Sequence, residues 1–284
     1  MKTGNRPALN AQPRPTAPIT PTAPMREKKN AGRCIDKRAK ARIVAHTMDS
    51  YENPFVVAET SDETQATFYR KTYGLVALSF LAWAVTLGGL FLVGAAEPLA
   101  NLMFGSGRLG WLVVLGLFWA ATSWAQSLAF SRSSSLTQYM GLALYIVAEV
   151  VIFVPLMVVV AQQTNGDVGE ILAPAGIFTG LLIAALTATV FMTRINFSFL
   201  RTAVVLGSFF ALGCIVCFSI FGNSPGMWFA VVMIVLMSAA ILWQTGKVKD
   251  SCAPDQHVGA AVLLFAGFMT LLWYVIQLFL SRRS

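Results

Sequence analysis

The sequence contains few charged residues. Only 12% of its 284 residues are Asp, Glu, Lys or Arg, whereas 56% are hydrophobic. Soluble domains carry roughly 25% charged residues. This composition excludes an ordinary soluble domain and indicates an integral membrane protein, so we expect the lipid bilayer to be the first partner of the chain.

Positive charge is scarce outside the N-terminal region. Thirteen of the 21 Lys and Arg residues lie at or before Lys71, so the net charge of +8 describes that region and not the whole chain. Basic residues beside apolar segments orient a membrane protein and attract anionic lipid. We read the basic excess as a topology signal and expect no nucleic-acid partner.

Histidine and cysteine are also scarce. The two histidines are His46 near the N-terminus and His257 at the start of the last apolar segment, so no Ser–His pair lies within a predicted helix. Cys214 and Cys217 fall inside an apolar segment, where small packing residues are a simpler interpretation than a zinc or redox pair. We expect no enzyme activity, no metal centre and no cofactor.

The N-terminus has no apolar run of the kind found in a secretory signal. Residues 1–71 are polar, first basic and rich in proline and then acidic beyond Met48, and they lack the apolar content to bury a core. We predict a disordered tail over 1–71 and a transmembrane domain over 72–284. The abrupt change of composition suggests the hypothesis that the native start is Met48.

Seven apolar runs of about 20 residues follow, each long enough to cross a hydrocarbon core of about 30 Å as a helix. Backbone amides in lipid must be bonded within the protein, and such long runs do not fit the alternating strands of a barrel. We predict an all-α fold, a polytopic transmembrane bundle of about seven helices. The predicted spans are 73–95, 109–130, 138–161, 171–193, 199–221, 226–244 and 257–280.

The basic residues beside these spans favour a cytoplasmic N-terminus. On the cytoplasmic side they would be Arg70, Lys71, Arg132, Arg194, Arg201, Lys247 and Lys249. On the other side they would be Arg108, Arg282 and Arg283, and this last pair leaves the side of the C-terminus open. With its short loops and few cysteines, the chain fits a multi-pass protein of a bacterial inner membrane.

Glu149 is the one acidic residue in the middle of a predicted span. A charged side chain at this depth costs roughly 2.5–3.5 kcal/mol on insertion scales, so it should face protein or water. With no Lys or Arg at comparable depth, its expected partners are neutral. They are Thr122, Ser123, Gln126, Ser127 and Gln244. Two interpretations stay open: a site for a proton or cation, and a protonated side chain bonded to a neighbouring helix.

Pro155 follows Glu149 in the same predicted helix. Its missing amide and its ring release the carbonyl of Val151 from the helix ladder. The released carbonyl could help the carboxyl to bind a cation, and a packing kink is the alternative. The candidate residues for an ion site are thus Glu149, Gln126, Pro155 and Gln244.

Small residues recur every four positions in the fourth predicted helix, at Gly176, Gly180, Ala184 and Ala188. Such a stripe allows the close approach of another helix. We therefore predict that these residues pack against a neighbour and that this helix is central in the bundle.

Several stretches of the sequence resemble one protein family. They are FYRKTYGLVALSFLAWAV at the first span, GIFTGLLIAALTATVFMTRINFSFLRTAVVLG across the fourth and fifth, and LWQTGKV and AAVLLFAGFMTLLWYVIQLF in the last two. Over about 65–283 the chain resembles the Bax inhibitor-1, or transmembrane BAX inhibitor motif, family. The resemblance implies seven helices, a cytoplasmic N-terminus and, for some members, a pH-sensitive calcium leak governed by two aspartates on the last two helices.

The chain departs from this pattern at both acids. Gln244 stands where the sixth-helix signature has Asp, and Gly267 is the best match for the Asp of the seventh. A Gln facing a Gly can neither share a proton nor repel a like charge. Two functions stay open: a calcium or proton leak or permease in which Glu149 supplies the acid, and a non-conducting regulatory protein that binds other membrane proteins.

Overall fold

The computed structural model describes residues 56–105, 107–131, 134–193, 195–221 and 226–282. The chain divides into two units, Met1–Glu52 and Asn53–Ser284. The predictions of a disordered tail up to residue 55 and of a native start at Met48 lie outside the described residues. All the structural statements below concern the second unit.

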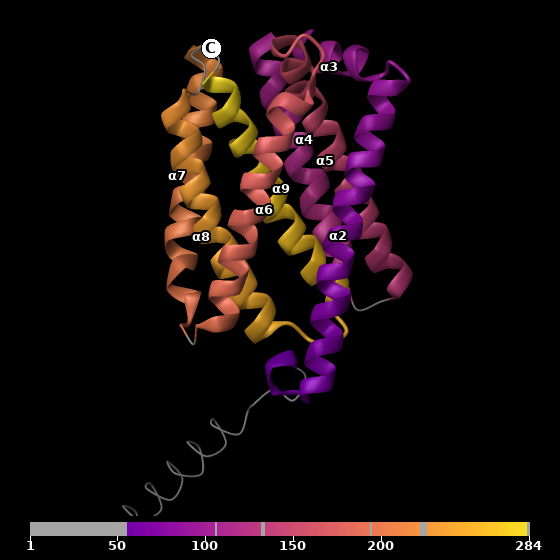
Figure 1. Ribbon diagram of the computed structural model, residues 1–284, viewed down its shortest axis with the longest axis vertical. Helices are drawn as coiled ribbons and strands as arrows, with labels where there is room; N and C mark the ends of the chain where they lie inside the picture. The colour runs from indigo at the N-terminus through magenta and orange to yellow at the C-terminus, as the bar shows by residue number, and fades with distance from the viewer. Residues whose placement is uncertain (1–55, 106, 132–133, 194, 222–225, 283–284) are drawn as a thin grey trace, which may run out of the picture. The chain divides into compact units, whose positions relative to one another are not determined.

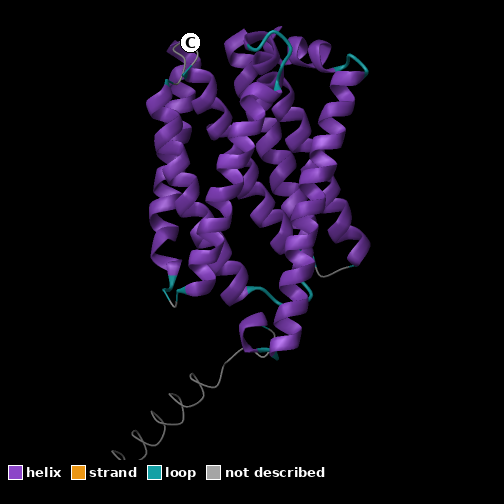
Figure 2. Ribbon diagram, in the orientation of Figure 1, coloured by secondary structure: helices purple, strands orange, loops and turns teal. Residues whose placement is uncertain are grey.

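The described residues form helices joined by short loops (Figure 2). Seven of these helices are long and apolar enough to span a membrane, which confirms the predicted all-α transmembrane bundle. The helices are η1 (Val57–Glu59), α2 (Asp62–Leu92), α3 (Ala96–Gly105), α4 (Gly107–Ala129), α5 (Ser135–Gln163), α6 (Gly169–Met192), η2 (Phe197–Phe199), α7 (Leu200–Phe221), α8 (Met227–Ser251) and α9 (His257–Ser281).

The core of the bundle is built around α5 and α9, the two spans that are mostly buried. Helix α9 runs between the others and packs against α2, α4, α5, α6 and α8 (Figure 1). Phe265, Leu264 and Met269 on α9 and Phe153 on α5 are almost completely inaccessible. The other five spans keep one face exposed, as helices do where they contact lipid tails.

The small-residue stripe of α6 does not pack as predicted. Gly176, Gly180 and Ala184 are exposed, and no atom lies within 4 Å of a Cβ built on either glycine. Helix α6 packs on α8 and α9 through a neighbouring face that carries Ala175 and Thr179. Successive residues are about 100° apart around a helix. Two residues that follow one another in the sequence can therefore lie on different faces, one packed and the other exposed.

Helix α2, the first span, starts before residue 72, where the transmembrane domain was predicted to begin. Helix α2 begins at Asp62, and before it the Val57 amide donates a hydrogen bond to the Cys252 carbonyl at 2.9 Å. Asp62 and Glu63 lie in the first turn, where acidic side chains stabilise the helix dipole. Residues 57–71 thus belong to the folded unit, and the tail predicted over 1–71 extends too far.

A short helix that the sequence analysis missed, α3, connects the first two spans. It packs against α4 and α5 through Ala96, Ala100 and Met103, which follow one another at helical spacing. At ten residues it is too short to span a bilayer. The helical spacing of its apolar residues is visible in the sequence, but a search for apolar runs long enough to span a membrane does not detect so short a helix.

Helix α5 continues through Pro155 without interruption. At its start the Ser134 hydroxyl accepts a hydrogen bond from the Thr137 amide at 3.2 Å, which caps the helix. Gly141 on α5 permits very close contact with α4, because a Cβ at this position would lie 2.6 Å from both the Ala125 carbonyl oxygen and the Ala129 amide nitrogen.

We expect Gly141→Ala to destabilise the protein, since the colliding atoms belong to the backbone of α4 and can move only with that helix. Overpacking of this kind costs about 1–3 kcal/mol. The midpoint of thermal unfolding in detergent measures the effect. Gly213→Ala on α7 is the matched control, because its Cβ would contact nothing. Equal midpoints for the two variants would contradict the close α4–α5 packing.

Candidate functional site

Glu149 lies at the centre of α5 and is only 3% exposed. Glu149 is buried because α5 is surrounded by α2, α3, α4 and α9, and most of the circumference of α5 therefore faces protein. One turn earlier, the Tyr145 side chain interacts with Glu149 and with Gln126 of α4. The carboxyl is thus reached by neutral polar groups, and in the described part of the chain it forms no ion pair.

A cavity of about 200 Å³ adjoins Glu149. Its polar lining comes largely from α9, where Thr270, Tyr274 and Gln277 follow one another at helical spacing. The remaining lining is apolar and aromatic. It consists of Trp111, Leu115, Phe118, Ile152, Phe153, Ile215, Phe229 and Trp273. The site is therefore a small, mostly apolar cavity whose polar lining consists of one carboxyl and three side chains of α9.

A second cavity, of about 600 Å³, adjoins the first and lies nearer one end of the bundle. The two share Trp111, Trp273 and Gln277 as lining residues. The second also reaches Pro155 on α5 and Ser281 at the end of α9. The second cavity thus lies between the cavity of Glu149 and the end at which α9 terminates, the upper end in Figure 1.

Toward the opposite end the space beside Glu149 is filled by aromatic side chains. Phe265 of α9 packs edge to face against Tyr145, with ring centroids 6.2 Å apart, and against Phe80 of α2 at 5.3 Å. Tyr145 and Phe265 are both buried. The cavities around the carboxyl are thus asymmetric, extended toward one end and closed toward the other.

Gln244 and Gly267 are in contact across the α8–α9 interface. A Cβ at Gly267 would collide with Oε1 of Gln244, and this oxygen is buried without a hydrogen-bond partner among the described residues. Gln244 and Gly267 therefore face each other, as the resemblance implied for these two positions. Gln244 does not line the cavity of Glu149, so its predicted role as a partner of that carboxyl is wrong.

The predicted hydroxyl partners of Glu149 are used elsewhere. Thr122 donates to the Phe118 carbonyl at 2.8 Å, and Ser127 donates to the Ser123 carbonyl at 3.0 Å, both within α4. Ser123 is exposed. Of the predicted group, Gln126 alone is connected with the carboxyl, through Tyr145. Pro155 lies in the second cavity and not beside Glu149.

The sequence analysis missed Tyr145, Thr270, Tyr274 and Gln277. A signal was present for each. Tyr145 precedes Glu149 by four residues and so lies on the same face of the helix. The three residues on α9 form the polar stripe of a strongly apolar helix, at positions 270, 274 and 277. Neither pattern identifies a site by itself, because isolated aromatic and polar residues are common in membrane spans and at their ends.

The fold and the site define a multi-pass membrane protein of seven spanning helices with a buried carboxyl beside an internal cavity. The sequence model of the family described as Inhibitor of apoptosis-promoting Bax1 matches residues 65–284. The chain therefore belongs to the Bax inhibitor family. No significant match was found among curated proteins or among solved structures.

The contact between Gln244 and Gly267 leads to a coupling prediction. We expect Gly267→Ala to lower the thermal unfolding midpoint, less than Gly141→Ala does, because the colliding Gln244 oxygen ends a side chain and is not backbone. In a Gln244→Ala background the same substitution should cost less, since the colliding group is gone. Equal costs in the two backgrounds, measured as a double-mutant cycle, would show that the side chains do not touch.

Proposed function

We propose that this protein is a proton leak of the membrane and not an enzyme, with Glu149 as the residue that takes up and releases the proton. The observation that carries the proposal is one buried carboxyl beside a cavity that adjoins a second cavity nearer one end of the bundle. An acid in the middle of a bilayer is costly to keep and, by default, suggests a functional site.

The composition of the cavity favours a proton over a calcium ion. Calcium is bound by six to eight oxygen atoms, usually from several carboxylates. Among the described lining residues Glu149 is the single acid, accompanied by Thr270, Tyr274 and Gln277. The Thr270 hydroxyl donates to the Ala266 carbonyl within α9 at 2.9 Å. The Tyr274 hydroxyl can both accept and donate a hydrogen bond and so could pass a proton to the carboxyl.

The asymmetry of the cavities suggests how the leak is controlled. With the proposed cytoplasmic N-terminus, the end toward which the cavities extend faces away from the cytoplasm, and the cluster of Tyr145, Phe265 and Phe80 separates Glu149 from the cytoplasm. Conduction then requires this cluster to open. We place the protein in a bacterial inner membrane on the grounds of its short loops and few cysteines.

The contact between Gln244 and Gly267 supports a relocation of the acid. In the pattern of the family these positions carry the two aspartates that respond to pH. Here they hold a glutamine and a glycine, and neither residue can bind or lose a proton in the physiological range. A pH response in this chain would then come from Glu149 on α5.

The proposal is tested with the purified full chain in liposomes that contain a pH-sensitive dye. We expect proton flux in the wild type, and its loss in Glu149→Gln because an amide keeps the shape of the side chain but cannot carry a proton. Glu97→Gln is the matched control, since it removes an exposed carboxyl from α3 and should leave the flux unchanged.

A calcium dye in parallel liposomes distinguishes the other outcomes. Calcium flux that depends on Glu149 would place the chain among calcium leaks with a relocated acid. Flux that is equal in wild type and Glu149→Gln would remove the role of this residue. Folded protein that conducts neither ion would overturn the proposal and favour a regulatory protein that binds another membrane protein, which co-purification in stoichiometric amount would establish.

A further inference from the structure

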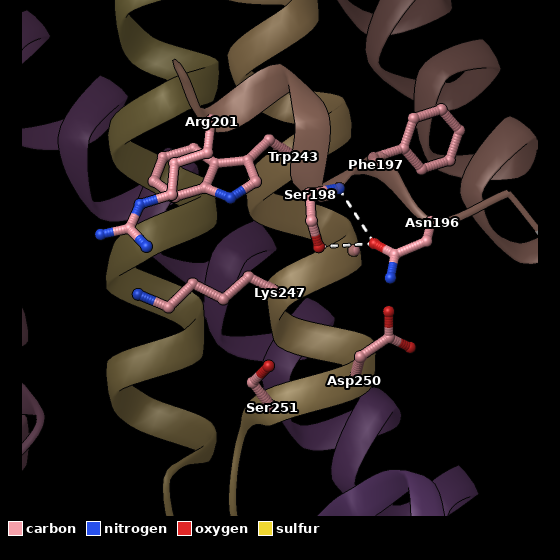
Figure 3. Close-up of a pocket in the computed structure, with 9 residues that line it drawn as sticks. Asn196, Phe197, Ser198, Arg201, Trp243, Lys247, Asp250 and Ser251 are labelled. Atoms are coloured by element: carbon pink, nitrogen blue, oxygen red, sulfur yellow. Dashed lines mark hydrogen bonds between the residues drawn. The ribbon is translucent and has the colours of Figure 1, made fainter. Parts of the chain in front are cut away.

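A second polar cavity lies at the other end of the bundle, where α7 begins and α8 ends. It measures about 450 Å³ and is separate from the cavities that adjoin Glu149 (Figure 3). The residues that matter for its chemistry are Asn196, Ser198, Arg201, Trp243, Lys247 and Asp250.

Two cations line this cavity from different helices. Arg201 stands in the first turn of α7 and Lys247 near the end of α8, and Figure 3 shows both side chains extending toward the same side. Within the described residues neither forms an ion pair. The ammonium of Lys247 lies 5.9 Å from the ring centroid of Trp243. Two like charges held on one cavity favour an anion between them.

A third cation nearby provides a contrast. Lys249 donates a hydrogen bond to the Val190 carbonyl at 3.2 Å, at the end of α6, and its ammonium lies 5.9 Å from the ring of Phe191. Its charge thus stabilises the last turn of a helix, where free carbonyls carry partial negative charge. Among the described residues, no backbone carbonyl accepts a hydrogen bond from the side chain of Arg201 or of Lys247, although both lie at the same end of the bundle.

The opposite side of the cavity carries a negative charge. Figure 3 shows Asp250 beside Asn196, whose side-chain oxygen accepts hydrogen bonds from the amide and the hydroxyl of Ser198. Among the described lining residues, the side-chain charges are therefore two positive and one negative. A ligand with one negative group and an amine would match both sides.

We infer that this cavity binds a phosphate ester, with Arg201 and Lys247 contacting the phosphate and Asp250 favouring an ester that also carries an amine. Arg and Lys are the side chains that bind phosphate most often, Arg through paired donors and Lys as a point charge. Phe197 and Trp243 supply an apolar wall beside the cations. Basic cavities between spanning helices at this level bind lipid headgroups.

Two sources share this chemistry, a phospholipid headgroup and a soluble phosphate ester. Native mass spectrometry of the delipidated full chain in detergent distinguishes them, with phosphatidylethanolamine, phosphatidylglycerol, glycerophosphoethanolamine and inorganic phosphate as probes. We expect the wild type to retain phosphatidylethanolamine most strongly. Binding of only the soluble probes would keep the phosphate site and assign it a soluble ligand, and binding of none would overturn the inference.

Variants then locate the site. Arg201→Gln and Lys247→Gln should each reduce the bound fraction of phosphatidylethanolamine several-fold, whereas Arg282→Gln removes the same charge at the other end of the bundle and should not. Asp250→Asn should raise the binding of phosphatidylglycerol relative to that of phosphatidylethanolamine. Equal retention by Arg201→Gln, Lys247→Gln and Arg282→Gln, with all three eluting as folded protein, would overturn the inference.

Discussion

The burial of Glu149 is the constraint on which the arrangement of the bundle depends. Lipid tails offer no hydrogen bonds, so a carboxyl at this depth must face protein or an internal cavity and not lipid. Helix α5 satisfies this by lying at the centre with α9, surrounded by the helices that meet the lipid. The polar stripe of α9 and the Tyr145 side chain then supply the groups that a lipid-facing position would lack.

The architecture could be predicted because the length of an apolar run is a local property. Seven runs of spanning length gave seven helices, and family resemblance over about 65–283 agrees with the matched residues 65–284. The errors concern features that depend on neighbours. Helix α2 extends to Asp62 because residues before it pack on the end of α8, and the small residues of α6 lie one position away from its packed face.

The candidate site was predictable in part for the same reason. Glu149 stands out because its charge contradicts the surrounding sequence, and this needs no knowledge of the fold. Its partners could not be chosen among the polar residues of α4, because Thr122 and Ser127 bond to their own helix while Gln126 reaches across to Tyr145. The resemblance, in contrast, implied that Gln244 and Gly267 face each other, and the two residues are in contact in the structure.

Through its contact with α9, helix α8 links the cavity lined by Arg201 and Lys247 to the cavity that adjoins Glu149. Lys247 lines the basic cavity at its end, and Gln244, one turn earlier, rests against Gly267 of α9. Farther along α9, Thr270, Tyr274 and Gln277 line the cavity of Glu149. A ligand held between Arg201 and Lys247 would fix the end of α8 against α7. Because Gln244 lies on the same helix one turn before Lys247, that ligand would also hold its contact with Gly267 of α9 in place.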